Sequence, residues 1–87
     1  MTEPEKLQRA QDFIDQELHR RAVERIDALT WEQTPQDRVT RIHRLVVFRD
    51  GEKSIFTFTE YELIDNYGSK KWEKKLRSHV GDVLMEI

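Results

Sequence analysis

The fold is decided by residues 45–59, LVVFRDGEKSIFTFT. Residues 45–48 are apolar and residues 54–59 are rich in β-branched and aromatic side chains, so the two runs predict a β-hairpin. Asp50 and Gly51 lie between them and supply the positive φ that a tight hairpin turn needs. The pattern fits a loop of two residues or a loop of three with a bulge. These two loops give different strand registers, so the register stays open.

The chain after the hairpin predicts two helices. Thr59 and Glu62 have capping-box spacing, so the second strand should lead directly into a short helix that runs as far as Tyr67. Gly68 is placed to end that helix, and Ser69 is placed to cap the next one. The apolar residues of the last helix recur at helical spacing, and they are Trp72, Leu76, Val80, Val83 and Ile87.

The chain before the hairpin begins with an amphipathic helix, predicted from Pro4 to about Leu29. Its apolar stripe consists of Leu7, Ala10, Ile14, Leu18, Ala22, Ile26 and Leu29. Thr2 and Glu5 have capping-box spacing at its start. A helix of this length extends for about 39 Å at 1.5 Å per residue, so we expect part of its stripe to be left for a partner.

The segment between this helix and the hairpin is less decided. Residues 30–37 are polar and contain Pro35, which predicts a loop or short turn around Trp31. Residues 35–44 fit a helix start or a strand, and the apolar run that follows favours a strand from about Arg41. The helices should pack as a layer on the hairpin, because a two-stranded hairpin is barely stable alone. The fold class is therefore α+β.

Composition indicates one small domain, residues 1–87, in which 37% of the residues are hydrophobic and 37% are charged. The chain has no cysteine, so it offers neither disulfides nor thiolate metal ligands. It has no apolar run near the roughly 18 residues of a membrane span, and its start does not resemble a secretion signal. We therefore expect a cytoplasmic protein that does not enter a membrane.

The residue types that carry most enzyme chemistry form no recognisable site. His19, His43 and His79 lie on different predicted elements and lack the spacing of a metal site. The three glycines have local structural explanations, and no phosphate-binding glycine pattern occurs. We therefore expect no catalytic residue, no metal and no cofactor.

Positive charge gathers in residues 38–49 and 70–77, although the net charge of the chain is only −2. Such groups neutralise phosphates, and Tyr67 or Trp72 is placed to stack on a base. The candidate nucleic-acid contacts are Arg41, Arg44, Lys70, Lys71, Lys74, Lys75 and Arg77. Two observations oppose this interpretation: Trp72 lies on the apolar stripe of its helix, and the isoelectric point of about 5.9 is low for a dedicated binder.

The arginines also have a structural interpretation. Arg41 and Arg44 can pair with Asp12, Asp15 or Glu17 of the first helix, or can keep a sheet edge from pairing with other chains.

The sequence favours a small non-enzymatic module that docks on a protein partner or self-associates as a homo-oligomer, through its long helix or its hairpin edge. The alternative is a nucleic-acid-binding regulatory protein that uses residues 38–49 and 70–77. An enzyme subunit whose site forms only on assembly ranks third.

Overall fold

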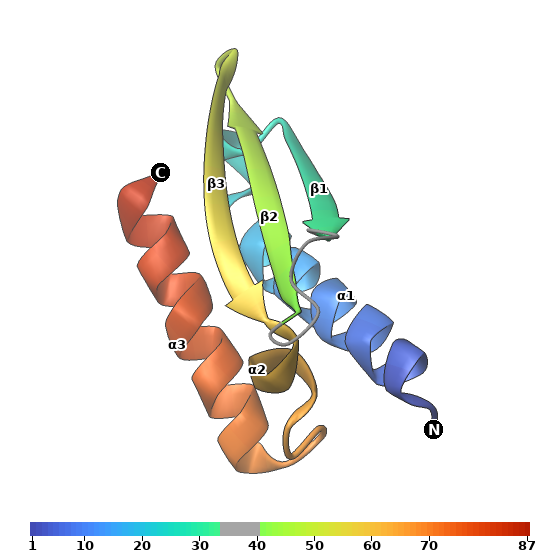
Figure 1. The fold of residues 1–87 in the computed structure, drawn as a ribbon. Helices are drawn as coiled ribbons and strands as arrows, with labels where there is room; N and C mark the ends of the chain where they lie inside the picture. Colours follow the sequence, from blue (N-terminus) through green and yellow to red (C-terminus); the bar gives the residue numbers. More distant parts are fainter. Residues whose placement is uncertain (34–40) are drawn as a thin grey trace.

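The computed structural model describes residues 1–33 and 41–87 and confirms the α+β class (Figure 1). An N-terminal helix is followed by a three-stranded antiparallel sheet, in the order β1-β2-β3, and then by two helices. The helices are α1 (Glu3–Ala22), α2 (Glu60–Ile64) and α3 (Lys70–Glu86), and a 3-10 turn, η1 (Val23–Arg25), follows α1. The strands are β1 (Ala28–Gln33), β2 (Ile42–Arg49) and β3 (Glu52–Thr59).

The first helix is shorter than predicted. It ends at Ala22, where the backbone leaves the helical region at φ −145° and ψ 32°. The Asp27 amide then donates to the Phe48 carbonyl (2.8 Å), and the Asp27 carboxylate accepts from the Asp50 amide (2.8 Å). These contacts fasten the chain beside the hairpin, so Leu29 reaches the core from a strand and the predicted helix end is wrong.

Trp31 lies in the strand β1, so the loop predicted around it is wrong and the sheet has three strands. Its indole N–H donates to the Asp15 carboxylate on α1 (2.8 Å), and its ring packs on Phe58 with centroids 5.4 Å apart. The part of the ambiguous segment that the structure describes is extended, since β2 begins at Ile42, and the remainder, residues 35–40, lies outside the described residues.

The hairpin has the two-residue loop. Asp50 and Gly51 have φ of 51° and 78°, and the flanking residues Arg49 and Glu52 face each other. Positive φ at both central residues matches the twist of the strands on either side. Phe58 therefore lies opposite His43, and every register position of β2 and β3 follows from this turn.

The local helix signals after the hairpin are confirmed. The Thr59 hydroxyl accepts from the Glu62 amide (3.1 Å), and the Ser69 hydroxyl accepts from the Trp72 amide (3.1 Å). The helix α2 ends at Ile64, earlier than expected, and Gly68 reverses the chain at φ 83°. A side chain at that φ is unfavourable, which explains the glycine.

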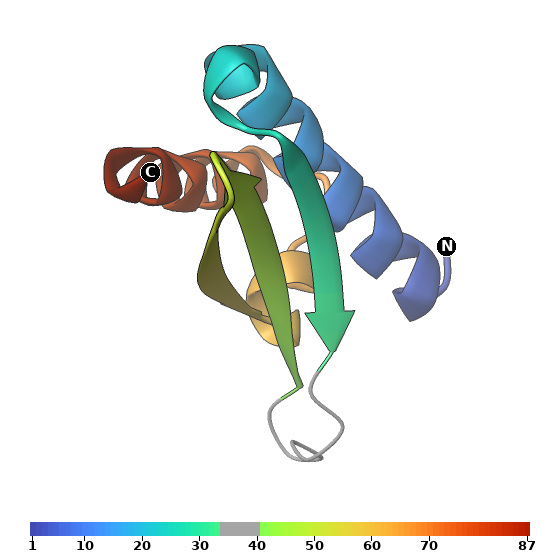
Figure 2. The same cartoon turned by 90° about the horizontal axis from the view of Figure 1, so that it is seen from above.

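The molecule has two layers, with α1 and α3 on one face of the sheet (Figure 2). Between the layers lies a core with little or no exposed surface, formed by Ile14, Leu18, Leu45, Val47, Phe58, Leu63, Leu76 and Val80. Four residues of the predicted stripe on α1, namely Ala10, Ile14, Leu18 and Ala22, are buried in this core, and Leu7 is partly buried against it, so little of the stripe on α1 is exposed. None of the helices in the described residues combines the length and apolar character that crossing a bilayer requires.

Candidate interaction surfaces

The strand β3 has a free edge in the described part of the chain, because its only neighbour in the sheet is β2. Arg49 and Glu52 flank a two-residue turn and therefore exchange backbone hydrogen bonds, and such pairs alternate along an antiparallel ladder. Residues 54, 56 and 58 consequently point their N–H and C=O groups at β2. Residues 53, 55, 57 and 59 point theirs outward, away from the sheet.

The two edge strands differ in charge. Residues 54–59 of β3 read Ser-Ile-Phe-Thr-Phe-Thr and contain no charge, proline or glycine. The strand β1 is shorter, follows Asp27 and contains Glu32. Charges, proline and bulges are the usual features that prevent strand addition at an edge. The charges of β3 are confined to Glu52 and Lys53 beside the turn, so residues 54–59 form an edge segment that lacks these features.

The sheet face opposite the helices carries exposed apolar side chains. Phe48 is 37% exposed and Ile55 is 49% exposed. Between them, at the centre of this face, Val46 is only 2% exposed, because it lies between Thr30 of β1 and Ile55 of β3. The exposed apolar surface therefore lies towards the hairpin end and continues onto β3.

On the side of the sheet that faces the helices, β3 borders α3, and we call this border the seam. His79 of α3 stacks on Phe58 with centroids 4.0 Å apart. Two open depressions lie near this seam, one between α2 and α3 and the other where the turn end of the hairpin meets the end of α3. One, of about 360 Å³, is lined by Glu62, Lys75, Ser78, His79 and Asp82. The other, of about 170 Å³, is lined by Arg49, Glu52, Ser54, Glu86 and Ile87.

Two histidines hold the short helix α2 against the sheet and α3. The buried His43 has its Nε2 3.3 Å from Glu60 Oε1, and His79 Nδ1 lies 3.0 and 3.1 Å from the two Glu62 oxygens. The hydrogen bond with Glu62 raises the pKa of His79. Partial burial opposes this rise, and the negative charge of Asp82 adds to it. Within the described residues, no three His, Cys, Asp or Glu side chains cluster as metal ligands.

The predicted basic residues divide into a free group and a paired group. Lys70, Lys71, Lys74 and Lys75 are exposed on the first turns of α3, and no ion pair among the described residues engages them. Arg77 instead pairs with Glu73 (2.8 Å) and with Glu17 (3.5 Å).

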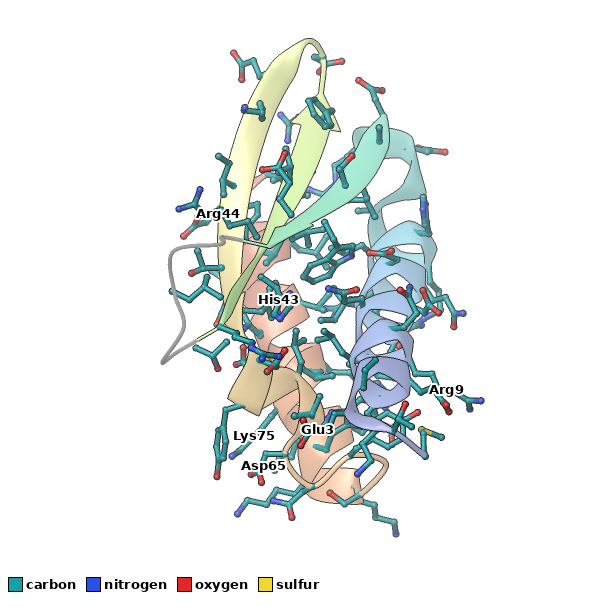
Figure 3. The ribbon with its side chains drawn as sticks, turned by 45° about the vertical axis from the view of Figure 1, so that its right-hand side comes forward. Glu3, Arg9, His43, Arg44, Asp65 and Lys75 are labelled. Atoms are coloured by element: carbon teal, nitrogen blue, oxygen red, sulfur yellow. The ribbon has the colours of Figure 1, made fainter. Side chains whose placement is uncertain are left out.

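Arg41, just before β2, and Arg44 of β2 have different surroundings from the lysines. Arg41 pairs with Glu60 (3.5 Å) and not with an acid of α1. Arg44 extends from the exposed face of the sheet, whereas Lys75 lies lower, beside α2 (Figure 3). Arg38 lies outside the described residues.

The acids of α1 have other partners than the predicted arginines. Asp15 accepts from Trp31, and its partial burial raises its pKa while that hydrogen bond opposes the rise. Glu17 accepts from Arg20 (2.7 Å), which lowers the pKa of Glu17. Asp12 accepts from the side-chain amide of Gln8 (3.0 Å).

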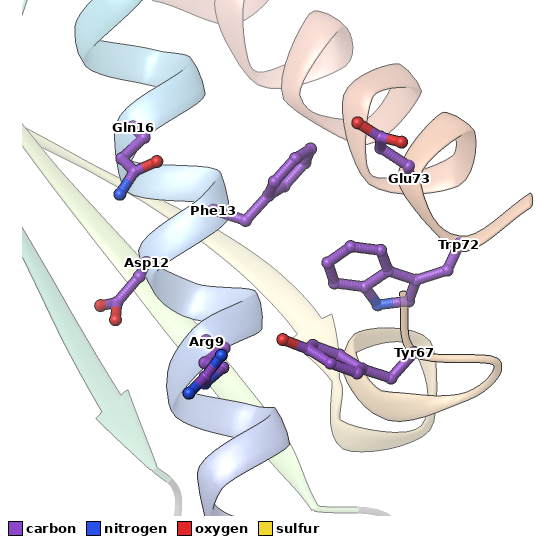
Figure 4. A pocket seen from close by; sticks show the side chains of 7 residues that line it. All are labelled: Arg9, Asp12, Phe13, Gln16, Tyr67, Trp72 and Glu73. Carbon is purple, nitrogen blue, oxygen red and sulfur yellow. The ribbon is translucent and has the colours of Figure 1, made fainter. Parts of the chain in front are cut away.

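An open pocket of about 550 Å³ lies between α1 and the start of α3 (Figure 4). Its aromatic lining consists of Phe13, Tyr67 and Trp72, with ring centroids 5.2 Å apart for Phe13–Trp72 and 4.9 Å for Tyr67–Trp72. Trp72 is 7% exposed, and its indole N–H donates to the Leu63 carbonyl (2.8 Å). Trp72 is therefore a core residue and is not presented for base stacking.

Comparison of the chain with protein-family models, curated proteins and solved structures finds no match. The sequence indicates the hairpin edge as a candidate but not which strand forms it, because that depends on where β1 pairs. The acids of the seam, Asp82 and Glu86, were missed since nothing in their spacing separates them from a solvated helix face.

Proposed function

We propose that this chain is a non-enzymatic protein-docking module whose contact strand is β3. The main support for the proposal is the outer edge of β3, where residues 55, 57 and 59 are uncharged and direct their backbone groups away from the sheet. An unprotected edge strand is a ready template for pairing with another segment. The exposed Phe48 and Ile55 extend the same surface with apolar area. The proposal extends to location: a chain without cysteine suits a reducing compartment, and we assign it to the cytoplasm.

Site-specific photocrosslinking in cells tests the docking function and does not require the partner to be identified first. A benzophenone amino acid at position 55 or 57 should form adducts with protein. The matched control is the same amino acid at Tyr61, which is 71% exposed but lies on α2, outside the proposed contact. Adducts at 55 and 57 that are absent at 61 support the function. Equal labelling at all three positions, or no protein adduct at 55 and 57, refutes it.

A nucleic-acid-binding function is the second candidate, and the lysines of α3 support it. Like charges at positions i, i+3 and i+4 repel, and cations are unfavourable near the positive N-terminal end of a helix. Lys70, Lys71, Lys74 and Lys75 meet both conditions without an ion-pair partner among the described residues. An anionic partner would offset this cost.

A fluorescence titration of the two tryptophans with mixed-sequence nucleic acid tests this candidate. Binding at low salt that weakens steeply near physiological ionic strength supports it, provided that Lys71→Gln with Lys74→Gln removes most of the affinity. Arg20→Gln is the control, because Arg20 is exposed but lies on α1 and pairs with Glu17. Absence of binding at low salt excludes the candidate.

A further inference from the structure

The width of the two layers leaves room for one more strand. Three strands spaced about 4.8 Å apart make a layer roughly 14 Å wide, whereas two helices of about 10 Å diameter make a layer roughly 20 Å wide. The helix layer therefore overhangs the sheet. Figure 1 shows the overhang beside β3, where α3 lies beyond the edge of the strand. A fourth strand would bring the sheet to about 19 Å and match the helices.

From this geometry we infer that the occupant of the β3 edge is a single extended peptide segment that contains lysine or arginine, bound as a fourth strand beneath α3. The inference rests on the proposed docking function and names its partner. The peptide backbone pairs with the outward groups of Lys53, Ile55 and Thr57. Its side chains alternate between the exposed sheet face and the seam with α3.

A second copy of the chain fits this edge less well. Edge-to-edge pairing of two copies gives six strands, about 29 Å wide, beneath four helices that need about 40 Å. Each copy would bring its own α3 to the same overhang. A bare strand has no helix of its own and avoids this collision.

The seam also selects the charge of the peptide. The two depressions near it contain the carboxylates of Glu52, Glu62, Asp82 and Glu86. Arg49 and Lys75 are the opposing cations in these linings, together with His79 when its ring is protonated. The four carboxylates outnumber these three groups, which leaves a net negative surface. Phe56, which is only partly buried, packs against the core from the strand that borders the seam. A peptide side chain that combines an apolar stem with a cationic head, as lysine and arginine do, suits this lining.

The probe is a short labelled peptide of alternating lysine and valine, and its matched control has glutamate in place of lysine. The lysine peptide should bind and the glutamate peptide should not. Thr57→Pro should weaken binding about tenfold or more, because proline removes an outward N–H and leaves the ladder to β2 intact. Asp82→Asn combined with Glu86→Gln should weaken binding by several fold. Glu73→Gln should leave binding unchanged, because Glu73 pairs with Arg77 along α3 and does not line the two depressions.

Two further measurements distinguish a folding defect or a second copy of the chain from peptide docking. Circular dichroism shows whether the Thr57→Pro chain has folded. If it has not, Ile55→Lys replaces this variant, and Thr30→Lys on the other edge strand is the control for Ile55→Lys. Equal binding of both peptides, or lysine-peptide binding that neither Thr57→Pro nor Ile55→Lys reduces, overturns the inference. A mass of twice 10.5 kDa for the chain alone, lost in Ile55→Lys, overturns it in favour of a second copy but sustains the docking function. Absence of protein adducts at positions 55 and 57 overturns both.

Discussion

The contact between His79 and Glu62 predicts a pH-dependent contribution to stability, which Glu62→Gln isolates. The Glu62 hydrogen bond raises the pKa of His79 in the folded chain. A raised pKa means that the folded state favours the protonated ring. The contribution is fully present below the unfolded pKa of about 6.5 and is lost as the pH rises through the folded value.

The magnitude follows from the geometry of the pair. A hydrogen bond between charged groups contributes about 1.5–3 kcal/mol when it is shielded from water. The side chains of His79 and Glu62 are 27% and 30% exposed, so we discount the value to about 1 kcal/mol. For a domain of this size, that corresponds to a change in Tm of about 4–8 °C.

The assay is thermal unfolding of the original chain and of Glu62→Gln at about pH 6 and about pH 8.5. The difference in Tm between the two chains should be largest at the lower pH and should shrink at the higher one. Glu73→Gln is the control, because Glu73 pairs with Arg77, whose charge does not change in this range. A Glu62→Gln difference that is the same at both pH values would refute the assigned role of His79.

Three further predictions concern substitutions at Trp31, at two glycines and at Lys71. Trp31→Phe keeps a smaller aromatic ring at this position but removes the indole N–H that donates to Asp15. It should lower the free energy of unfolding by at least about 1 kcal/mol in urea titrations, and an unchanged urea midpoint contradicts this. Gly81→Ala should raise the free energy of unfolding by about 0.5–1 kcal/mol, since Gly81 is inside α3 and an added Cβ meets nothing within 4 Å. Gly68→Ala should lower it by about 1 kcal/mol, because the φ of Gly68 is 83°. The reverse order of the two Tm values contradicts both expectations. Lys71→Glu should raise Tm by a few degrees, about 0.5 kcal/mol, by relieving repulsion at the start of α3, and a lower Tm would show that the lysines already have partners in the isolated chain.

The features that the sequence predicted correctly depend on short-range chemistry. The turn at Asp50 and Gly51 and the caps at Thr59 and Ser69 each involve residues within a few positions of one another. The apolar spacing of α3 was sufficient because one face of a single helix is buried. Such signals act before any distant part of the chain is in place.

The features that it missed depend on contacts between distant residues. Ile26 and Leu29 continue the helical spacing of α1, yet both reach the core after the helix has ended, and spacing alone cannot distinguish these cases. The strand β1 exists because it pairs with β2, which no local pattern encodes. The same holds for the pairing of Arg77 with Glu17 and for the contact of Phe58 on β3 with His79 on α3.

The aromatic pocket and the lysines illustrate how structure changes the weight of a motif. Trp72 has the residue type expected for stacking, but its burial and its bond to Leu63 give it a structural role. The four lysines remain exposed, so the second candidate function now depends on charge alone.

Amide hydrogen exchange along β3 tests whether β3 is the docking strand, because it reports whether each N–H points into the fold or out of it. In the isolated chain the amides of Ile55 and Thr57 should exchange quickly, while those of Phe56 and Phe58 should exchange slowly through their bonds to β2. The lysine-valine peptide should then slow exchange at Ile55 and Thr57. If both amides are already protected in the monomer, or remain fast at saturating peptide, β3 is not the docking strand.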